Sequence, residues 1–468
     1  MNAEEIVDAK EIRILIWIYF LLLIFEGVLR KWVLPGLAEP LLLVRDPFLV
    51  LIYVAAFARG VFVINGTVIV LGVLGLFSVL LGFTVGSGNL IVTAYGFDAM
   101  FFHLPLIFIL PRVMNRDHVV GIGRAMLWFC LPMAAIMILQ FRAGPEDWVN
   151  VGAGGTVGAQ IRGALGKIRP PGFFSFITGA AQFLGLATAF LLFGWIRKGT
   201  YLRYLLLLAG GAIALSAGIS SSRLTLGSIG LIFVMLGLIV LLDRKSVAGV
   251  VRMLVPIGII LLVVTNLDVF QEGGEVFEAR FEEAGDANVN VIGKAGNWTE
   301  RVFADFLGGF KAIEHAPILG AGLGVGTNVG ARVLSGEFGF LLAEGEWARC
   351  VLELGPLFGL LYLFTRLAMA INIFLPAIRS AREGNALPLL IFGACGPLML
   401  AGQFGQPTTV GFAVLGSGLC LASRNVPPEV EVDLCAEEEE AVQASARKVR
   451  GRSIFAESLH ESSSKESV

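Results

Sequence analysis

Residues 266–290 are NLDVFQEGGEVFEARFEEAGDANVN, and residues 297–328 are NWTERVFADFLGGFKAIEHAPILGAGLGVGTN. Residues 341–355, LLAEGEWARCVLELG, then lead into a long apolar stretch. The polar interval Asn266–Glu344 therefore interrupts a sequence that is otherwise mostly apolar. Hydrocarbon cannot satisfy so many polar groups, so this interval must lie outside a bilayer that the rest of the chain spans. It predicts a large loop that closes over a site at the membrane surface.

The composition is that of a polytopic membrane protein. The 468 residues are 56% hydrophobic and 15% charged, whereas soluble domains are about 25% charged. The net charge of −2 gives no case for nucleic acid as a partner. The five cysteines show no metal-ligand spacing, and those in apolar segments are interpreted as small buried residues. We therefore predict no metal site, and we interpret the first apolar segment as a membrane span rather than a signal peptide.

The spacing of apolar segments predicts an all-α bundle of about twelve transmembrane helices, each with roughly 20 residues to cross ~30 Å of hydrocarbon. In the second segment, Asp46 and Pro47 are typical of a helix start, so that helix is expected to begin at Asp46 after an extended lead-in, 40–45. His103, in the fourth, is interpreted as a buried residue with a partner in its own helix. The predicted segments are 13–29, 40–59, 61–83, 89–110, 118–141, 173–196, 201–219, 224–242, 248–265, 347–375, 386–404 and 407–423.

Positive charges recur in alternate connections, and cytoplasmic loops of membrane proteins are enriched in Lys and Arg. The pattern predicts cytoplasmic N- and C-termini, a bundle over 1–423 with outer loops at 142–172 and 266–346, and a disordered cytoplasmic tail over 424–468. Arg30 and Lys31 are exceptions on the outer side. The charges that set this orientation are Arg59, Arg112, Arg116, Arg197, Lys198, Arg203, Arg244, Lys245, Arg379 and Arg382.

Several arginines lie on the predicted outer side, against that rule. The guanidinium group suits phosphate and carboxylate oxygens, so these residues predict a surface for an anionic, phosphate-bearing substrate. Arg223 directly follows three serines in a short turn, and Arg169 precedes Pro170–Pro171, so both are held in place. Arg280 is interpreted as pairing with neighbouring glutamates. The outer charges are Arg142, Arg162, Lys167, Arg169, Arg223, Arg280, Arg301, Arg332 and Arg349.

The large loop divides into parts. Residues 266–297 are acidic and are interpreted as mobile. Apolar residues at three- and four-residue spacing predict an amphipathic helix over 299–316, with Thr299 as its N-cap and Arg301 near its start. The glycines of 320–330 follow no strand, so they favour tight turns, or a close approach of the backbone to a ligand, over a nucleotide-binding loop.

Carboxylates then gather at the start of the tenth predicted span. Glu346, Arg349 and Glu353 share one face of a helix, which allows ordinary ion pairs between them. The alternative is functional: Glu344 or Glu346 acts as a general base toward an acceptor hydroxyl, with its pKa raised by partial burial. The sequence leaves both interpretations open.

The order of motifs from 169 to 361 resembles the O-antigen ligase and O-antigen polymerase family of bacterial membrane glycosyltransferases. The motifs are RPPGFFSF, SSSR, R-x-F-x-D-F, PILGAGLG and WARCVLELG. The resemblance implies a GT-C-like helical bundle in the inner membrane, with its site on the periplasmic face. It further implies a substrate glycan carried on undecaprenyl diphosphate, and no metal, nucleotide sugar or other cofactor.

The resemblance also implies roles for particular residues. Arg169, Arg223 and Arg301 match positions that hold the diphosphate. Glu344 stands where the family has a catalytic histidine, so Glu344 or Glu346 would have to replace it.

The expected function is therefore polymerisation or ligation of a lipid-linked glycan for exopolysaccharide or O-antigen-type polysaccharide. The partners expected are undecaprenyl-diphosphate-linked oligosaccharide, membrane lipid and other polysaccharide-assembly proteins. Two alternatives remain: a transporter or flippase for an anionic solute or lipid-linked glycan, and a noncatalytic partner in a polysaccharide assembly complex. A transporter predicts charged residues near the middle of the membrane and two related halves.

Overall fold

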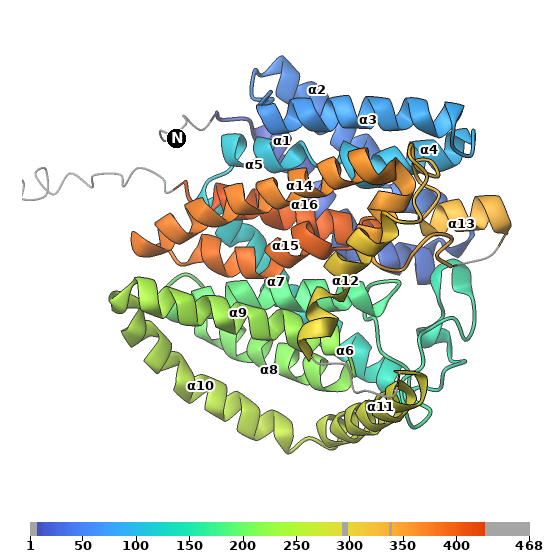
Figure 1. Ribbon diagram of the computed structural model, residues 1–468. Helices are drawn as coiled ribbons and strands as arrows, with labels where there is room; N and C mark the ends of the chain where they lie inside the picture. The colour runs from blue at the N-terminus through green and yellow to red at the C-terminus, as the bar shows by residue number, and fades with distance from the viewer. Residues whose placement is uncertain (1–6, 293–297, 337–338, 426–468) are drawn as a thin grey trace, which may run out of the picture. The chain divides into compact units, whose positions relative to one another are not determined.

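Every regular element is a helix in the part of the chain that the computed structural model describes, residues 7–292, 298–336 and 339–425, with the side chains of 281–304 excepted (Figure 1). The chain divides into two units after Asn425, and the second, which holds most of the predicted tail, lies outside the described residues. The α-helices are α1 (Lys10–Val28), α2 (Asp46–Ala58), α3 (Gly66–Thr84), α4 (Leu90–Phe97), α5 (Leu106–Val113), α6 (Arg116–Arg142), α7 (Ile177–Ile196), α8 (Arg203–Ile219), α9 (Arg223–Leu242), α10 (Val247–Thr265), α11 (Asp268–Ile292), α12 (Trp298–Ala312), α13 (Asn328–Ser335), α14 (Glu346–Arg382), α15 (Leu387–Ala401) and α16 (Pro407–Ala422). Two π-helical turns, η1 (Leu29–Val33) and η4 (Asp98–Phe102), and the 3₁₀ turns η2 (Pro35–Leu37), η3 (Pro40–Leu43), η5 (Trp148–Asn150), η6 (Ala153–Gly155) and η7 (Arg244–Ser246) complete the set.

Among the described residues, eight helices are long and apolar enough to cross a membrane. The bent pair 90–102 and 106–113 makes a ninth if it forms one span, and α8, α15 and α16 are apolar but shorter. A helix lies in each of the twelve predicted segments. The all-helical membrane class is therefore supported, while the twelve crossings and the periplasmic side of the large loop remain predictions.

Two spans are interrupted. Helix α2 begins at Asp46, as predicted, but its lead-in is the 3₁₀ turn η3 rather than an extended segment. The span from α4 to α5 changes direction by 42°, and the π-helical turn η4 lies at the break. Extra residues in π-helical turns are frequent at functional sites.

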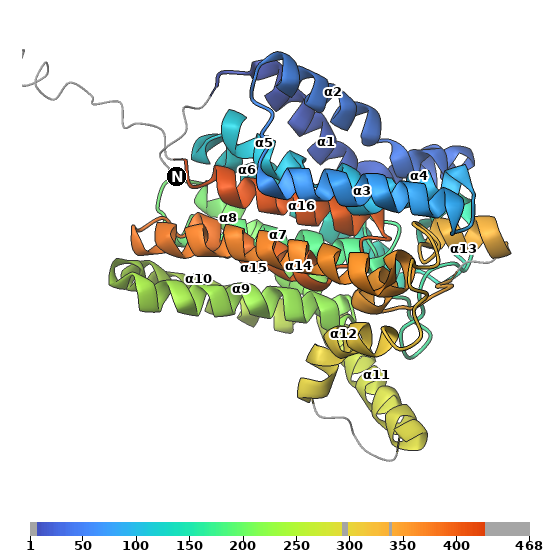
Figure 2. The ribbon, with the colours of Figure 1, turned by 45° about the horizontal axis from the view of Figure 1, so that its top comes forward.

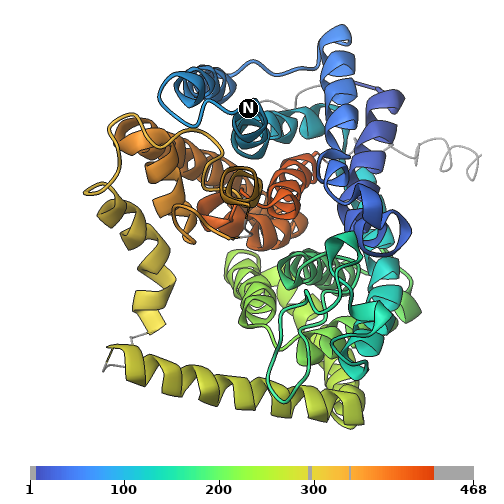
Figure 3. The same ribbon diagram turned by 90° about the vertical axis from the view of Figure 1, so that its right-hand side faces the viewer.

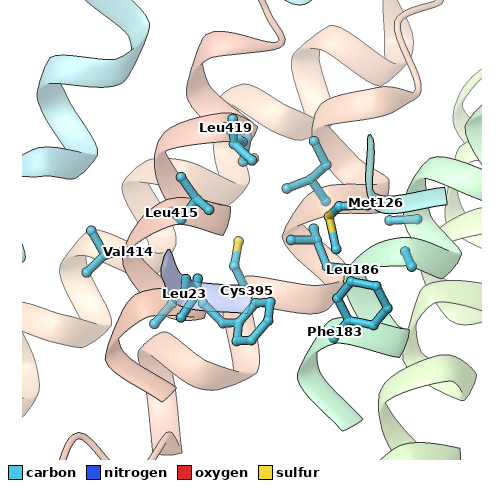
Figure 4. Close-up of a cluster of buried hydrophobic side chains, with 14 of the residues drawn as sticks. Leu23, Met126, Phe183, Leu186, Cys395, Val414, Leu415 and Leu419 are labelled. Carbon is cyan, nitrogen blue, oxygen red and sulfur yellow. The ribbon is translucent and has the colours of Figure 1, made fainter. Parts of the chain in front are cut away.

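Helix α7 forms the centre of the bundle and is buried over nearly its whole length. It packs against α6, α8, α9, α10, α15 and α16, and Figure 1 shows it running between α15 and α9. Glycine and alanine make up much of α7, and small residues let membrane helices approach closely. Figure 4 shows Phe183 and Leu186 of α7 beside Met126 of α6 and Cys395 of α15. The buried, unpaired Cys395 fits the packing role predicted for the cysteines.

Helices α11 and α12 belong to the large loop and lie at one end of the bundle (Figure 2). Figure 3 looks along the bundle and shows α11 lying across the axes of the other helices. Helix α11 covers most of the acidic part, 266–297, that is interpreted from the sequence as mobile; that mobility stays a prediction. The first turns of α11 pack on α8, where Phe270 and Gly273 contact Gly218. This acidic stretch therefore has one face that is buried against the bundle. Helix α12, which packs on α14, confirms the amphipathic helix predicted from 299.

Candidate functional site

Three arginines from distant parts of the sequence converge at the α11 end of the bundle. Arg169 precedes α7, Arg223 is the first residue of α9, and Arg280 lies on α11. Burial and the positive charges of Arg280 and Arg223 lower the pKa of Arg169 from its ordinary value to about 10. The Nε atom of Arg169 is buried with no hydrogen-bond partner. We call Arg169, Arg223 and Arg280 the arginine cluster; the positive charges of Arg223 and Arg280 act on Arg169.

Local backbone geometry holds the arginine cluster in place. Ser221, in the turn between α8 and α9, has a left-handed backbone with φ +45°, and its carbonyl oxygen accepts a hydrogen bond from Nη1 of Arg280. Gly172, just after Pro170–Pro171, also has a positive φ of +59°. The carbonyl of Gly172 accepts from Nζ of the buried Lys31 at 2.6 Å, and its N–H donates to Gln140 Oε1 at 2.8 Å. These bonds fix the segment from which Arg169 projects.

The structure brings together two of the three arginines that the sequence assigns to the diphosphate. Arg169 and Arg223 are in the cluster, whereas the side chain of Arg301 lies outside the described residues. Arg280 bonds the turn that precedes Arg223. Its predicted pairing with neighbouring glutamates stays a prediction, because the side chains that directly follow it lie outside the described residues. Its position was detectable in principle, because Gly273, Val276 and Arg280 follow helical spacing and the first two are buried.

A second group of charges is buried at the start of α14. Arg349 donates to Glu346 through Nε (2.9 Å) and Nη2 (3.0 Å), and to Glu353 through Nη1 (2.9 Å). Arg366, on the same helix, donates to Glu346 at 2.6 Å. Both ion pairs that the sequence allowed are therefore present. Because both oxygens of Glu346 accept from arginines, its geometry is that of an ion-pair residue, and a role as general base finds no support in these contacts.

Arg366 was not singled out from the sequence. It stands in an apolar stretch, and its remaining donors reach the end of α15: Nε bonds the Met399 carbonyl, and Nη2 bonds the carbonyls of Leu398 and Gly402, each at 3.0 Å. A charged residue within a span needs such partners, so the signal was its presence in an apolar segment.

A small pocket adjoins this ion network. Glu344 lies at its exposed side, so the burial expected for that carboxylate is not found, and its backbone carbonyl accepts from Gln403 at 2.8 Å. Thr178, in the first turn of α7, donates to Gln406 at 3.2 Å and so connects the pocket to the segment that follows Arg169. A role for Glu344 as base stays a prediction. The pocket is lined by Gly326, Thr327, Asn328, Phe340, Glu344, Glu346, Arg349, Gln403, Gly405 and Gln406.

The glycine-rich turns pack against a break in α14, so the partner of their close approach is this chain's own backbone, whereas the sequence suggested a ligand. Gly355 has φ +79° and ψ 165°, which interrupts the helix and leaves carbonyls without intrahelical partners. The N–H groups of Ala321 and Gly322 bond the carbonyls of Leu352 (2.8 Å) and Glu353 (3.1 Å). The N–H of Gly326 bonds the carboxylate of Glu353 at 2.6 Å. The backbone that the glycines approach is therefore another part of this protein.

Asp305 of α12 connects the large loop to the start of α14. Its Oδ1 atom accepts from the N–H of Trp347 at 3.3 Å, and its Oδ2 atom is buried with no hydrogen-bond partner. Burial raises the pKa of this carboxyl above its ordinary value, although the Trp347 N–H and the charge of Arg366 act in the opposite direction. The first N–H groups of a helix have no acceptor within the helix, and Asp305 supplies one to the N–H of Trp347 at the start of α14.

Comparison of the chain with models of protein families, with curated proteins and with solved structures finds no match.

Proposed function

We propose that this chain polymerises or ligates a glycan carried on undecaprenyl diphosphate, at the periplasmic face of a bacterial inner membrane. The observation that carries the proposal is the arginine cluster. An anion with several oxygens suits neighbouring guanidinium groups, which can bind it through more than one donor. The unpartnered Nε of Arg169 is one such donor.

In the proposed reaction, a hydroxyl oxygen of the acceptor attacks the anomeric carbon of the lipid-linked glycan. The bond from that carbon to the diphosphate oxygen breaks, and undecaprenyl diphosphate leaves with the electron pair. The arginine cluster stabilises the charge on the leaving group, and Glu344 takes the hydroxyl proton. The glycan is transferred with inversion at the anomeric carbon.

The side chains beside Glu344 are of the kind that bind sugar hydroxyls, although the pocket itself is too small to enclose a sugar ring. Thr327, Asn328, Gln403 and Gln406 offer neutral donors and acceptors, and Phe340 offers an aromatic face. Such groups suit hydroxyls better than they suit phosphates. The connection between Thr178 and Gln406 keeps this pocket next to the segment that carries the diphosphate-binding Arg169.

The test uses the purified full chain with undecaprenyl-diphosphate oligosaccharide, and measures glycan length and released undecaprenyl diphosphate. Loss of one charge-assisted contact is worth about 1.5–3 kcal/mol, so Arg223→Ala and Arg169→Ala are expected to lower kcat/KM roughly 10- to 150-fold. Arg203→Ala is the matched control, because Arg203 is also an exposed first residue of an apolar helix, but at the α8 start. Equal activity in all three variants would refute the site.

The alternative from the sequence, a transporter, has one observation in its favour. It predicts charged residues far from the membrane surfaces, and buried charges do lie beside Tyr19, which is halfway along α1. The same assay in detergent micelles separates the two functions, because micelles have no compartments. Glycan transfer in micelles supports the enzyme, and a protein that moves substrate across vesicles without transferring it supports the transporter. A noncatalytic assembly partner would do neither, and its deletion would alter glycan length without abolishing linkage.

A further inference from the structure

Three potential metal ligands meet where the two interrupted spans come together. Asp46 is the first residue of α2, Asp98 is the first residue of the π-helical turn η4, and His103 follows that turn. One ligand atom from each residue, a ring nitrogen of His103 and a carboxylate oxygen of each aspartate, lies within 4.8 Å of the other two. None of these residues belongs to the arginine cluster or to the pocket beside Glu344. The broken backbone is what allows side chains from both spans to converge.

The histidine ring is held in a fixed orientation. Its Nδ1 atom lies 2.9 Å from the hydroxyl of Tyr19 on α1, and Nη1 of Arg45 donates to the same hydroxyl at 3.2 Å. Only 2% of His103 is exposed. The sequence predicted a partner for His103 within its own helix. The structure adds partners from other helices, Tyr19 of α1 and Asp46 of α2. Nε2 is left to face the two carboxylates.

The nearby arginines are used by other groups. Arg30 bonds Glu26 at 3.3 Å, and Arg45 lies 3.7 Å from the same carboxylate. Arg45 also bonds Tyr19 and, at 2.7 Å, the carbonyl of Pro407. Two arginines thus face one glutamate, while Asp46 and Asp98 face each other across His103. Two carboxylates this close in the interior need a positive charge between them.

The distances around His103 are short enough for all three side chains to hold one ion. The Oδ1 atom of Asp98 is buried and lies 3.1 Å from Nε2 of His103, a distance that suits two ligands of one ion as well as an ion pair with a protonated imidazole. The corresponding distance from Asp46 Oδ1 to Nε2 is 3.3 Å. Ligand atoms bound to one transition metal ion at ~2.0–2.2 Å lie roughly 3.0–3.5 Å from each other. Both distances fall in that interval.

We propose that His103, Asp46 and Asp98 bind a divalent transition metal ion of the Zn²⁺ or Mn²⁺ class. One imidazole and two carboxylates form a mixed nitrogen and oxygen ligand set that such ions accept. The contact of Nδ1 with Tyr19 is the outer hydrogen bond that metal-binding histidines make. The ion joins the start of α2 to the break between α4 and α5 and stabilises both. It is separate from the proposed glycan chemistry, for which the family resemblance implies no metal, so either proposal can fail without the other.

The test uses the full chain, purified in detergent, stripped with a chelator and titrated with Zn²⁺ or Co²⁺ alone. The expected result is one ion per chain, a rise in thermal stability on addition of Zn²⁺, and Co²⁺ absorption bands typical of nitrogen and oxygen ligands. His103→Gln and Asp98→Asn are expected to weaken Zn²⁺ binding at least 100-fold. His315→Ala is the control, because His315 is exposed and binds only adventitious metal.

Two results would overturn the proposal. One is stoichiometric metal binding that survives His103→Gln and Asp98→Asn, which would put the ion elsewhere. The other is that all Zn²⁺ or Co²⁺ binding by the wild-type chain is lost in His315→Ala, or that the wild-type chain binds neither ion. The second result would mean that a proton on His103 supplies the charge between the carboxylates. Because the second measurement is made on the unaltered chain, variants that fail to fold do not leave the question open.

Discussion

Replacing Arg366 by methionine tests the ion network at the start of α14. The change keeps an unbranched apolar side chain and removes the guanidinium group with its charge. Four hydrogen bonds are lost: one to Glu346 and three to carbonyls near the end of α15. The carbonyl of Leu398 keeps a partner, because the N–H of Gly402 also bonds it at 2.9 Å.

The magnitude follows from the charges. Glu346, Glu353, Arg349 and Arg366 sum to zero, so Arg366→Met leaves one negative charge without compensation in a buried site. Removing one partner of a buried ion pair costs about 3–5 kcal/mol. Glu346 retains its bonds from Arg349, which places the expected loss of unfolding free energy at the lower end, about 3 kcal/mol.

Denaturant-driven unfolding of the detergent-solubilised chain, followed by tryptophan fluorescence, measures this loss. Arg379→Met is the control on the same helix, since Arg379 is exposed and its loss is expected to leave stability unchanged. The double variant Glu346→Gln/Arg366→Met removes both charges and is expected to recover about 1–3 kcal/mol as a coupling energy. A loss equal to that of Arg379→Met, or a coupling energy near zero, would refute the reasoning.

Three further predictions follow from other parts of the site. Gly324→Ala is expected to lower the thermal unfolding temperature far more than Gly336→Ala. Both glycines have positive φ, but a Cβ at Gly324 would lie 2.0 Å from a carbonyl oxygen of α4, whereas the space at Gly336 is open. Asp305→Asn is expected to raise the free energy of unfolding at neutral pH, because the buried carboxylate is then charged. The gain should shrink as the pH falls through the raised pKa of Asp305 toward its ordinary value of 3.8, and a difference that stays constant across pH would contradict this. Pyrophosphate is expected to raise the melting temperature of the wild-type chain, less so at high salt and not in Arg169→Gln, and an equal rise in that variant would show that the arginine cluster is not the binding site.

The features that the sequence predicted well are local ones. Asp46–Pro47 marked the start of α2, and helical spacing of apolar residues located α12. Both rest on neighbours within a turn or two. The prediction for α14 placed its end near 375, whereas the helix continues to Arg382 through Pro376.

The features that were missed depend on contacts between distant residues. Arg280 bonds the turn before α9, and His103 contacts Tyr19 of α1. Arg366 bonds the end of α15 as well as Glu346 of its own helix. No spacing rule connects these pairs. The glycine-rich turns were expected to form tight turns or to approach a ligand, and the structure shows them bonded to the backbone of α14 at the break by Gly355. Whether a charge is a surface pair or part of a buried network depends on tertiary packing, which a single sequence does not contain.

The break at Gly355 has a consequence for how the chain assembles. Ala321 and Gly322 act as a missing turn of α14, because they bond the carbonyls that the break exposes. They precede α14 in the sequence and so leave the ribosome first. The part of α14 before Gly355 therefore completes its hydrogen bonding on a segment that has already been synthesised. Extra residues placed between the glycines are expected to delay the integration of α14 into the membrane, even where the residues of α14 itself are unchanged.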